Sequence, residues 1–449
     1  MVNQNSMLSS IAFSQTSDWN IKQFFGLCTI KSNFDLKKLG TAIKRRKDQM
    51  IVEDNKTYKR ITIKTNCGGV VVRDEVLGKA IKTKNQYYVR AGQLAVSKID
   101  ARNGAFGIVP PEADGAIITG NFWVYDVNPE IINIDYLVLL LSSNILTRIW
   151  LDCSNGSGNR LYLQEEKFLS YRIPMPNISV QNKIISKYHN LIFEASKIEE
   201  TASKILTNIE MYIMDKLNLH YIEPYDNSTS LRVVSYKNLN DKWEWDALSD
   251  AIERSMKDCI YPVKKLGKAV SFVNRSWNPK KSLLDRFMYI EIGGVNAIDN
   301  TSVANEILVS DAPSRATQFV KTGDLIIGTT RPYLKRFALI SEFEEGYVCS
   351  SGFQVIEARQ DYDLRFIVEV LKLNPIVKQF ESFMTGALYP AINSEQLRQV
   401  RIPMPSIEIQ KTIADYICRQ KTESYTLYTK ANSLKISAKK EFEEVIFGE

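Results

Sequence analysis

The pentapeptide Arg172-Ile173-Pro174-Met175-Pro176 recurs without change as Arg401-Ile402-Pro403-Met404-Pro405, 229 residues further along the chain. Other residues on both sides of it recur in the same order, with an offset that drifts only between 223 and 231. Self-similarity at a nearly fixed spacing is the signature of a repeat architecture. The sequence therefore predicts a tandem duplication of one structural unit.

The remaining matches extend this duplication over nearly the whole chain. These matches occur in the same order in both halves of the chain. Chance could produce one repeated pentapeptide, but it does not explain a whole ordered series of matches. In chain order they pair Asp18–Asn20 with Asp241–Trp243, Lys38–Gly40 with Lys265–Gly267, Gly68–Val70 with Gly293–Val295, Gly92–Leu94 with Gly323–Leu325, Phe122 and Val124 with Phe353 and Val355, Asn144 with Asn374, and Leu161–Tyr162 with Leu388–Tyr389.

The composition is that of a folded protein with two domains of ordinary size. The chain has 449 residues, of which 44% are hydrophobic and 24% charged. No apolar run reaches the roughly 18 residues that a membrane span needs, and residues 1–10 lack the pattern of a signal peptide. We therefore expect a cytoplasmic protein without a membrane partner.

Cysteine and histidine usage argues against metal and redox chemistry. The six cysteines form no C-x-x-C pair and are expected to be free thiols that pack as small hydrophobes. Only two histidines are present, His189 and His220, and both fall in a predicted helix. We therefore expect neither a metal site nor histidine-based acid–base catalysis. The net charge of +7 is a mild bias toward a polyanionic partner.

Each repeated unit is predicted to be mostly β at its beginning. Short runs of β-branched and aromatic residues, separated by glycine and proline turns, fill about 34–130 and 261–360. One short helix is expected to follow in each copy (about 134–150 and 364–381), and then a loop. Because two prolines spaced by one residue fit neither a helix nor a central strand, the pentapeptide is expected to form an edge strand or an extended segment.

A long helix is predicted after each pentapeptide, because apolar residues recur there every seven residues in two series. Alanines within the series allow close approach of two helices, so we predict that the helices pair with each other, antiparallel. Gln420, Ser424 and Glu441 interrupt the second series, where packing is expected to be looser. The alternative is two unrelated amphipathic helices, each packed on its own domain. The predicted pairing residues are Ile184, Tyr188, Leu191, Ile198, Ile205, Ile413, Ile417, Leu427 and Leu434.

The doubled arrangement of β-rich domain, Ile-Pro-x-Pro segment and glutamine-containing helix resembles the specificity subunit of type I restriction–modification systems. The residues on which this resemblance rests are Arg172–Pro176 with Gln181 and Ile184, and Arg401–Pro405 with Gln410 and Ile413. The Gly-Asp-Leu segment Gly323–Leu325 and the glycine-then-leucine loops at 158–161 and 386–388 support it. In the first copy Gln93 replaces the aspartate of Gly-Asp-Leu, which weakens that motif.

The resemblance implies an α+β fold with pseudo-two-fold symmetry, in which each mostly-β domain is a target recognition domain for one half of a split double-stranded DNA sequence. It implies that the helices set the spacing and dock two methyltransferase subunits, with restriction and translocase subunits as further partners. S-adenosylmethionine, Mg and ATP are then expected only in partner subunits, in a host-defence system of a bacterium or archaeon. The expected domains are 1–177, the helix 178–220, 221–406 with a linker at 221–240, and the helix 407–449.

A helix of about 37 residues spans roughly 55 Å, which is more than one turn of DNA at about 34 Å. A rigid helical pair suits a fixed spacing, since a flexible linker would tolerate variable ones. The resemblance therefore agrees with the physical properties of the predicted helices.

Candidate DNA contacts lie in loops of the β parts, where basic and polar side chains reach base edges or phosphates. The segments 97–104 and 329–336 align with each other, and so do the basic clusters that begin at Lys44 and Arg275. Arg331 or Arg336 is suited to guanine, Asn103 to adenine and Lys335 to phosphate. Solvated surface charge is the alternative explanation. The candidates are Lys44, Arg45, Arg46, Lys47, Lys98, Arg102, Asn103, Arg275, Lys280, Lys281, Arg331, Tyr333, Lys335 and Arg336.

No catalytic motif is complete. Asn278-Pro279-Lys280 and Asn374-Pro375-Ile376 are the nearest strings to the N/D-P-P-Y/F tetrapeptide of adenine methyltransferases, no Walker A loop exists, and glycine-rich Asn155–Asn159 is expected to be a turn. We therefore expect a non-catalytic DNA-specifying subunit with an asymmetric target. One alternative is a self-contained methyltransferase or nuclease, which would act without a partner. The other is a coiled-coil scaffold, which would show no salt-sensitive DNA binding.

Overall fold

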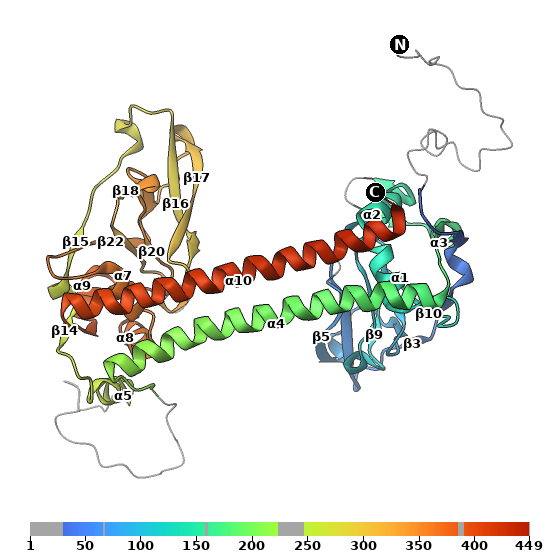
Figure 1. Ribbon diagram of the computed structural model, residues 1–449, viewed down its shortest axis with the longest axis horizontal. Helices are drawn as coiled ribbons and strands as arrows, with labels where there is room; N and C mark the ends of the chain where they lie inside the picture. Colours follow the sequence, from blue (N-terminus) through green and yellow to red (C-terminus); the bar gives the residue numbers. More distant parts are fainter. Residues whose placement is uncertain (1–29, 66–67, 158–159, 223–246, 385–389, 449) are drawn as a thin grey trace, which may run out of the picture. The chain divides into compact units, whose positions relative to one another are not determined.

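The computed structural model describes residues 30–65, 68–157, 160–222, 247–384 and 390–448 (Figure 1). The chain divides into two compact units: the first runs from the N-terminus to Lys197 and includes Ala431–Glu449, and the second is Ile198–Lys430. Both long helices, α4 (Ile178–Leu217) and α10 (Ile407–Phe447), contribute residues to each unit.

Several residues and segments used in the sequence analysis lie outside the described residues. The repeat matches among them are the tryptophan segments Asp18–Asn20 and Asp241–Trp243, Gly158, the loop at 386–388 and Leu388–Tyr389. The others are most of the expected linker 221–240, Cys28 and Cys67.

The first unit contains two larger sheets. One is antiparallel, with strand order β2–β10–β7–β8, and the other has the order β3–β6–β9–β4–β5, with β9 parallel to β4. The pair β1–β13 and the hairpin β11–β12 complete it. The strands are β1 (Leu36–Lys38), β2 (Ile43–Arg46), β3 (Gln49–Ile51), β4 (Thr57–Ile63), β5 (Val70–Leu77), β6 (Asn85–Tyr88), β7 (Leu94–Ser97), β8 (Phe106–Ile108), β9 (Ile117–Ile118), β10 (Phe122–Val127), β11 (Ser154–Ser157), β12 (Arg160–Leu163) and β13 (Arg172–Pro174).

Three short helices, α1 (Ile134–Leu141), α2 (Asn144–Asp152) and α3 (Glu165–Ser170), share a core with the four-stranded sheet of this unit. Trp150 is fully buried there, packs edge-on against Phe168 at 5.1 Å between ring centroids, and donates its indole N–H to the Leu141 carbonyl at 2.9 Å. A buried tryptophan needs such a partner for its polar atom. This aromatic core fixes the sheet that carries the first set of candidate loops.

The second unit repeats the plan with the antiparallel sheet β15–β22–β19–β20, the sheet β17–β16–β21–β18 and the pair β14–β23. Its elements are α5 (Ala247–Met256), β14 (Val263–Lys265), α6 (Leu266–Ala269), β15 (Val270–Val273), β16 (Arg286–Asn296), β17 (Thr301–Leu308), β18 (Ala316–Phe319), β19 (Leu325–Gly328), β20 (Phe337–Leu339), β21 (Val348–Ser350), β22 (Phe353–Ala358), α7 (Leu364–Val370), α8 (Asn374–Phe383), α9 (Ser394–Gln399) and β23 (Arg401–Pro403).

The two units share one topology, which confirms the predicted duplication and the α+β fold class. The order β2–β10–β7–β8 corresponds to β15–β22–β19–β20, and β1–β13 corresponds to β14–β23. Each pentapeptide forms a short strand paired on one side only, as its prolines require. Ile173 and Ile402 are fully buried, so the pentapeptides recur because they close equivalent cores.

Between the β part and the pentapeptide, each unit has more helices than the sequence predicted. The single short helix expected in each unit is two helices, because Ser143 caps a new helix in the first and Pro375 lies in the first turn of a new helix in the second. The expected loop contains α3 in the first unit and α9 in the second. These six-residue helices are too short for a periodicity signal.

The long helices pair antiparallel. In the second unit, Tyr212 stacks on Tyr416 with 3.9 Å between ring centroids, and Ser424 donates a hydrogen bond to the Ala202 carbonyl at 2.9 Å. Residues later in α4 therefore contact residues earlier in α10, as in an antiparallel pair. In the first unit, the beginning of α4 and the end of α10 share one core that includes Ile185 and Phe442 (Figure 1). Four alanines are buried along this seam: Ala195, Ala202, Ala431 and Ala438.

Candidate nucleic-acid interface

The two aligned loops predicted to face DNA occupy the same place in their domains. One connects β7 to β8 and the other connects β19 to β20, and each contains a single 3-10 turn, Ala101–Asn103 or Pro332–Leu334. The preceding strands Leu94–Ser97 and Leu325–Gly328 are buried along their whole length. A fixed strand therefore positions each loop, as in many binding sites.

The second-unit loop has an unusual backbone. Arg331 and Lys335, which flank its 3-10 turn, both adopt the left-handed conformation, with φ of 50° and 55°. Such a conformation costs about 1 kcal/mol or more for a residue with a large side chain, and it is concentrated at functional sites. Arg331 and Tyr333 are exposed. Their exposure and strained backbone make this loop the strongest candidate for base contacts in the second unit.

Arg336 is committed within the domain. Its Nη1 donates to the carbonyls of Ile292 and Gly293, each at 3.1 Å, and its side chain is half-buried. The guanidinium therefore ties the loop to strand β16. This structural role competes with the guanine contact that the sequence suggested for Arg336, which stays a prediction.

The first-unit loop presents a different set of groups. Lys98 Nζ lies 5.5 Å from the centroid of the Trp123 ring, and burial, together with the nearby Arg45, lowers the pKa of Lys98. Asn103 is exposed, and its amide donates to Asp100 at 3.3 Å. Arg102 is half-buried beside it. The polar group best placed for a base edge is therefore Asn103, because it is exposed at the end of the turn.

The cluster at Arg45 is largely structural. Arg45 donates to Glu165 at 2.7 Å, and its guanidinium carbon lies 5.4 Å from the Trp123 ring centroid and 5.6 Å from that of Tyr125. Burial also raises the pKa of Tyr125, whose hydroxyl contacts Glu165 at 3.2 Å. Arg45 therefore anchors α3 to the sheet, and its contact with DNA stays a prediction. Lys44 and Lys47 are exposed and remain candidates.

Arg46 and Arg275 each form an ion pair with an acidic residue of their own unit. Arg46 contacts Asp126 at 3.1 Å in the first unit, and Arg275 contacts Asp324 at 2.6 Å in the second. Arg275 also pairs with Glu357, and its side chain is only 18% exposed. These contacts give Arg275 a structural role, and its expected phosphate contact stays a prediction.

These pairs also account for Gln93 in place of the Gly-Asp-Leu aspartate. Asp324 accepts the Lys321 N–H at 2.7 Å and neutralises Arg275, whereas Gln93 accepts the Arg90 N–H at 2.8 Å and donates to Asp126 at 2.7 Å. The amide oxygen of Gln93 therefore forms the same turn as the Asp324 carboxylate does. An aspartate at position 93 would place a second negative charge beside Asp126, whereas the amide N–H₂ of Gln93 donates a hydrogen bond to it. Gly92 and Gly323 are the third residues of these turns, with φ of 81° and 84°, which glycine tolerates.

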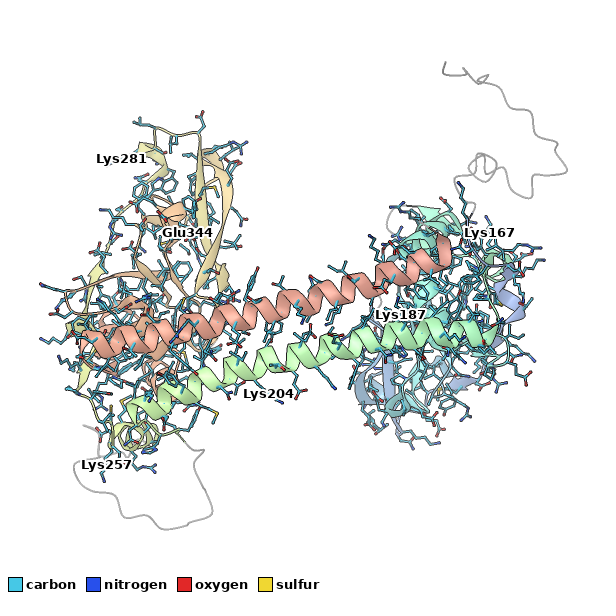
Figure 2. All side chains as sticks on the ribbon, in the orientation of Figure 1. Lys167, Lys187, Lys204, Lys257, Lys281 and Glu344 are labelled. Atoms are coloured by element: carbon cyan, nitrogen blue, oxygen red, sulfur yellow. The ribbon has the colours of Figure 1, made fainter. Side chains whose placement is uncertain are left out.

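Lysines outside these pairs remain exposed on the second unit. Lys280 and Lys281 follow Asn278, whose side chain accepts the Lys280 N–H at 3.0 Å and orders the turn. Figure 2 shows Lys281 at the periphery of the second unit. Such solvent-facing lysines suit contacts with phosphate, which fix the register of a protein on DNA without specifying its sequence.

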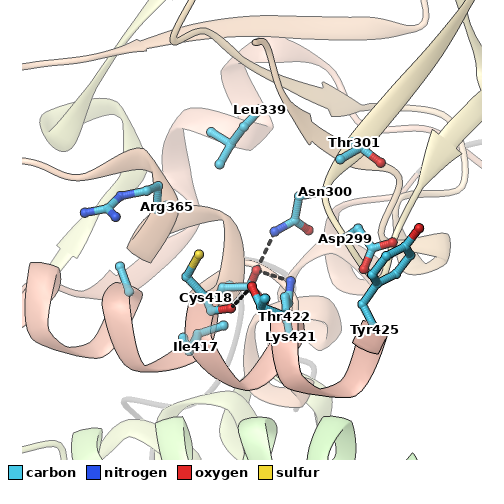
Figure 3. A pocket seen from close by; sticks show the side chains of 12 residues that line it. Asp299, Asn300, Thr301, Leu339, Arg365, Ile417, Cys418, Lys421, Thr422 and Tyr425 are labelled. Atoms are coloured by element: carbon cyan, nitrogen blue, oxygen red, sulfur yellow. Dashed lines mark hydrogen bonds and ion pairs between the residues drawn. The ribbon is translucent and has the colours of Figure 1, made fainter. Parts of the chain in front are cut away.

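A buried ionic cluster lines a cavity of about 530 Å³ in the second unit (Figure 3). Glu369 on α7 pairs with Lys421 on α10 at 2.5 Å and with Lys372 at 3.3 Å, and it accepts a hydrogen bond from Asn300. Burial lowers the pKa of Lys372 to about 8, although Glu369 opposes this shift. All three charged side chains are at most 15% exposed, so the cluster joins α10 to its domain.

The potential metal ligands, thiols and histidines are spread over the described part of the chain rather than gathered at one place. No group of three potential metal-ligating side chains occurs within them. Cys153, Cys259, Cys349 and Cys418 are free thiols, and burial raises the pKa of Cys349 to about 12, which opposes thiolate formation. His220 lies just beyond the end of α4 rather than within it, 3.4 Å from Asp258. In the same part of the chain no single helix is long and apolar enough to cross a membrane, although the bent pair α1–α2 passes that test jointly.

Comparison with known proteins identifies the repeated unit. The model of the type I restriction modification DNA specificity domain matches residues 16–209 and again residues 263–430. The chain belongs to this family. The two matches include both β-rich parts, both pentapeptides and part of each long helix, so the family's domain is present in two copies.

Individual relatives are distant. The HindI specificity subunit of Haemophilus influenzae is 27% identical over 112 residues, which is 24% of each chain, so the match spans about a quarter of that relative. A solved chain from the assembly of a type I R-M system covers 93% of this chain and 98% of its own, with a TM-score of 0.55 at 14% identity. The HsdS subunit from Thermoanaerobacter tengcongensis covers 92% of this chain and 97% of its own, at 16% identity and a TM-score of 0.42. The first of these structures supports the fold over nearly the full length of this specificity protein.

Proposed function

We propose that this chain is the non-catalytic, DNA-specifying subunit of a type I restriction–modification system, and that each of its domains recognises one half of a split target. The observation that carries this proposal is the presence of two specificity domains with one strand order and different loop chemistry. Equivalent strands hold the loops at equivalent places, and the loops supply different side chains. An asymmetric target follows, because different side chains select different bases.

Each domain would recognise its half-site through the β7–β8 or β19–β20 loop. Arg331 suits bidentate donation to guanine O6 and N7, and the amide of Asn103 suits adenine N6 and N7. The exposed lysines Lys44, Lys47, Lys280 and Lys281 would contact phosphates and give a salt-dependent part of the affinity.

The partners that fit this role are double-stranded DNA, two methyltransferase subunits docked along the paired helices, and restriction subunits that join them. S-adenosylmethionine, Mg and ATP would act in those partner subunits, inside the cytoplasm of a bacterial or archaeal cell. The antiparallel helices suit a fixed spacing between half-sites, because each has at least 40 residues and they pair through buried alanines.

The test combines the purified chain with the methyltransferase encoded beside its gene. We expect methyl transfer from S-adenosylmethionine to DNA only when both proteins are present, together with sequence-specific DNA binding that weakens as salt rises. Methylation by the chain alone would instead establish a self-contained enzyme. Binding that is insensitive to both sequence and salt would establish a scaffold and overturn the proposal.

A further inference from the structure

A basic pocket of about 380 Å³ lies on the five-stranded sheet of the first domain, apart from the loops discussed above. Its wall includes Arg60 on β4, Arg73 on β5 and Lys82 before β6. The remaining lining combines threonine hydroxyls with an apolar floor. These residues include Thr62, Thr83, Thr119, Ile117, Ile118 and Phe122.

A β-bulge brings the two arginines together. Arg60 pairs with Asp74 and Ile61 pairs with Val72, so Arg73 is an extra residue without a partner in the ladder. A bulge redirects a side chain and is over-represented beside functional sites. Arg73 is also exposed, which leaves its side chain accessible to a ligand from solution.

Asp74 holds the two guanidinium groups side by side. It accepts from Arg60 Nε and Nη2, both at 2.7 Å, and from Arg73 Nε at 3.2 Å. These hydrogen bonds keep the pKa of Asp74 below its usual range, so the carboxylate stays charged. One negative charge is then shared by two arginines, and Lys82 makes the pocket more positive.

The second domain has no such arrangement at the equivalent strands. The strands β16 and β17 also shift register, between Ile290 and Val295, but the residues paired before the shift are Tyr289 with Asn305 and Ile290 with Ala304, none of them basic. Tyr289 and Ile290 lie beside the parallel strand β21 as Arg60 lies beside β9, so neither residue at this place is an arginine. The basic pocket is therefore a feature of the first domain alone among the two described. Since the second domain has the same fold without these arginines, the fold itself does not require them.

We propose that this pocket binds the phosphodiester backbone of duplex DNA next to the half-site of the first domain, with Arg73 and Lys82 as the principal contacts. The inference rests on the proposed function. Arginine presents planar donors that match phosphate oxygens, and threonine hydroxyls are common phosphate ligands. The pocket positions the domain on DNA and does not discriminate between bases.

The experiment uses the complex of the full chain with its methyltransferase and a labelled duplex that contains the recognised site. Arg73→Ala and Lys82→Ala are compared with Lys79→Ala, which removes the same charge from an exposed residue of the same domain outside the pocket. Each pocket variant is expected to weaken binding about tenfold at 0.1 M salt and to reduce the slope of log K against log salt by about 1. Lys79→Ala is expected to change affinity less than about twofold.

The penalties for base changes in the first half-site should be the same in Arg73→Ala as in the wild type. Relaxed base preference would overturn the proposal, because Arg73 would then contact a base. Equal behaviour of Arg73→Ala and Lys79→Ala would also overturn it while leaving the proposed function intact. If the wild-type complex lacks sequence preference, the proposed function and this inference both fail. Thermal unfolding of each variant confirms that the exposed substitutions leave the domain folded.

Discussion

Gln181 and Gln410 show how one residue can recur for a structural reason. Both are buried, and each follows its pentapeptide by the same spacing. Gln181 donates to the carbonyls of Pro176 and Ile131, at 2.7 and 3.0 Å, and accepts the Asn133 N–H at 2.8 Å. Gln410 does the same with Pro405, Asp361 and Asp363. The glutamine therefore locks the start of each long helix onto its domain.

Replacing Gln181 with alanine should lower the free energy of unfolding by about 2–4 kcal/mol, because backbone groups of Ile131, Pro176 and Asn133 lose a buried partner. Urea unfolding followed by circular dichroism measures the change. Asn190→Ala, on the exposed face of the same helix, should cost less than about 0.5 kcal/mol. Equal losses in the two variants would show that the glutamine is not an anchor.

The Gly-Asp-Leu turn gives a second prediction at this scale. Asp324 is 2% exposed and holds Arg275, so Asp324→Asn should destabilise the chain by about 3 kcal/mol by leaving a buried charge under-compensated. Asp415→Asn is the matched control, because Asp415 is 60% exposed in its pair with Arg365 and should contribute less than about 1 kcal/mol. Differential scanning calorimetry compares the two. A stable Asp324→Asn variant would contradict the role given to Arg275.

The sequence indicated these turns but not their side-chain pairs. Glycine at positive φ leaves a strong local signal at Gly92 and Gly323. The ion pair of Arg275 with Glu357 joins residues 82 positions apart, and that of Arg45 with Glu165 joins residues 120 apart. Such partners depend on strand register, which local patterns do not specify. A basic cluster therefore looks the same in sequence whether it is an internal ion pair or a DNA contact.

At the scale of elements, the seven-residue periodicity predicted both long helices and their antiparallel pairing, but not which positions are most buried. Alanines form the close contacts, whereas Ile184, Tyr188 and Leu191 are half-buried. Ile413 and Ile417 are buried in the core of the second domain. Helices that pack on a domain as well as on each other follow a mixed pattern, and a pure heptad model misses this. The remaining predicted pairing residues, Ile198, Ile205, Leu427 and Leu434, are also half-buried.

The ionic cluster at Glu369 fixes α10 to the second domain, and it gives the third prediction. Glu369→Gln would leave Lys372 and Lys421 without their shared counter-charge in a buried place, and it should cost about 3–5 kcal/mol. Glu306→Gln removes an exposed carboxylate that pairs with Arg286 and should cost less than about 1 kcal/mol. Chemical denaturation of both variants gives the comparison. If Glu369→Gln unfolds at the wild-type denaturant concentration, the cluster does not secure α10.

At the scale of the whole molecule, the duplication combines one framework with two surface chemistries. The matching cores are closed by identical pentapeptides, so the duplication is visible in the amino-acid sequence alone. The differences lie where the structure places the strained Arg331 and Lys335 in one domain and two arginines, Arg60 and Arg73, at a β-bulge in the other. A bulge depends on the pairing of two strands, so a single strand's sequence does not reveal it. Function on this account depends on the parts that differ.

The central claim is that two domains on paired helices recognise two half-sites at a spacing set by the helices. One seven-residue heptad is inserted into α4 after Lys197 and another into α10 after Lys430, which preserves the antiparallel register. Methylated sites are then mapped by sequencing in cells that express this chain and its methyltransferase. We predict unchanged half-sites with a spacer up to about three base pairs longer, since seven residues add about 10 Å and a base pair about 3.4 Å. Methylation at the original spacing, or at an uninterrupted sequence, would contradict the account.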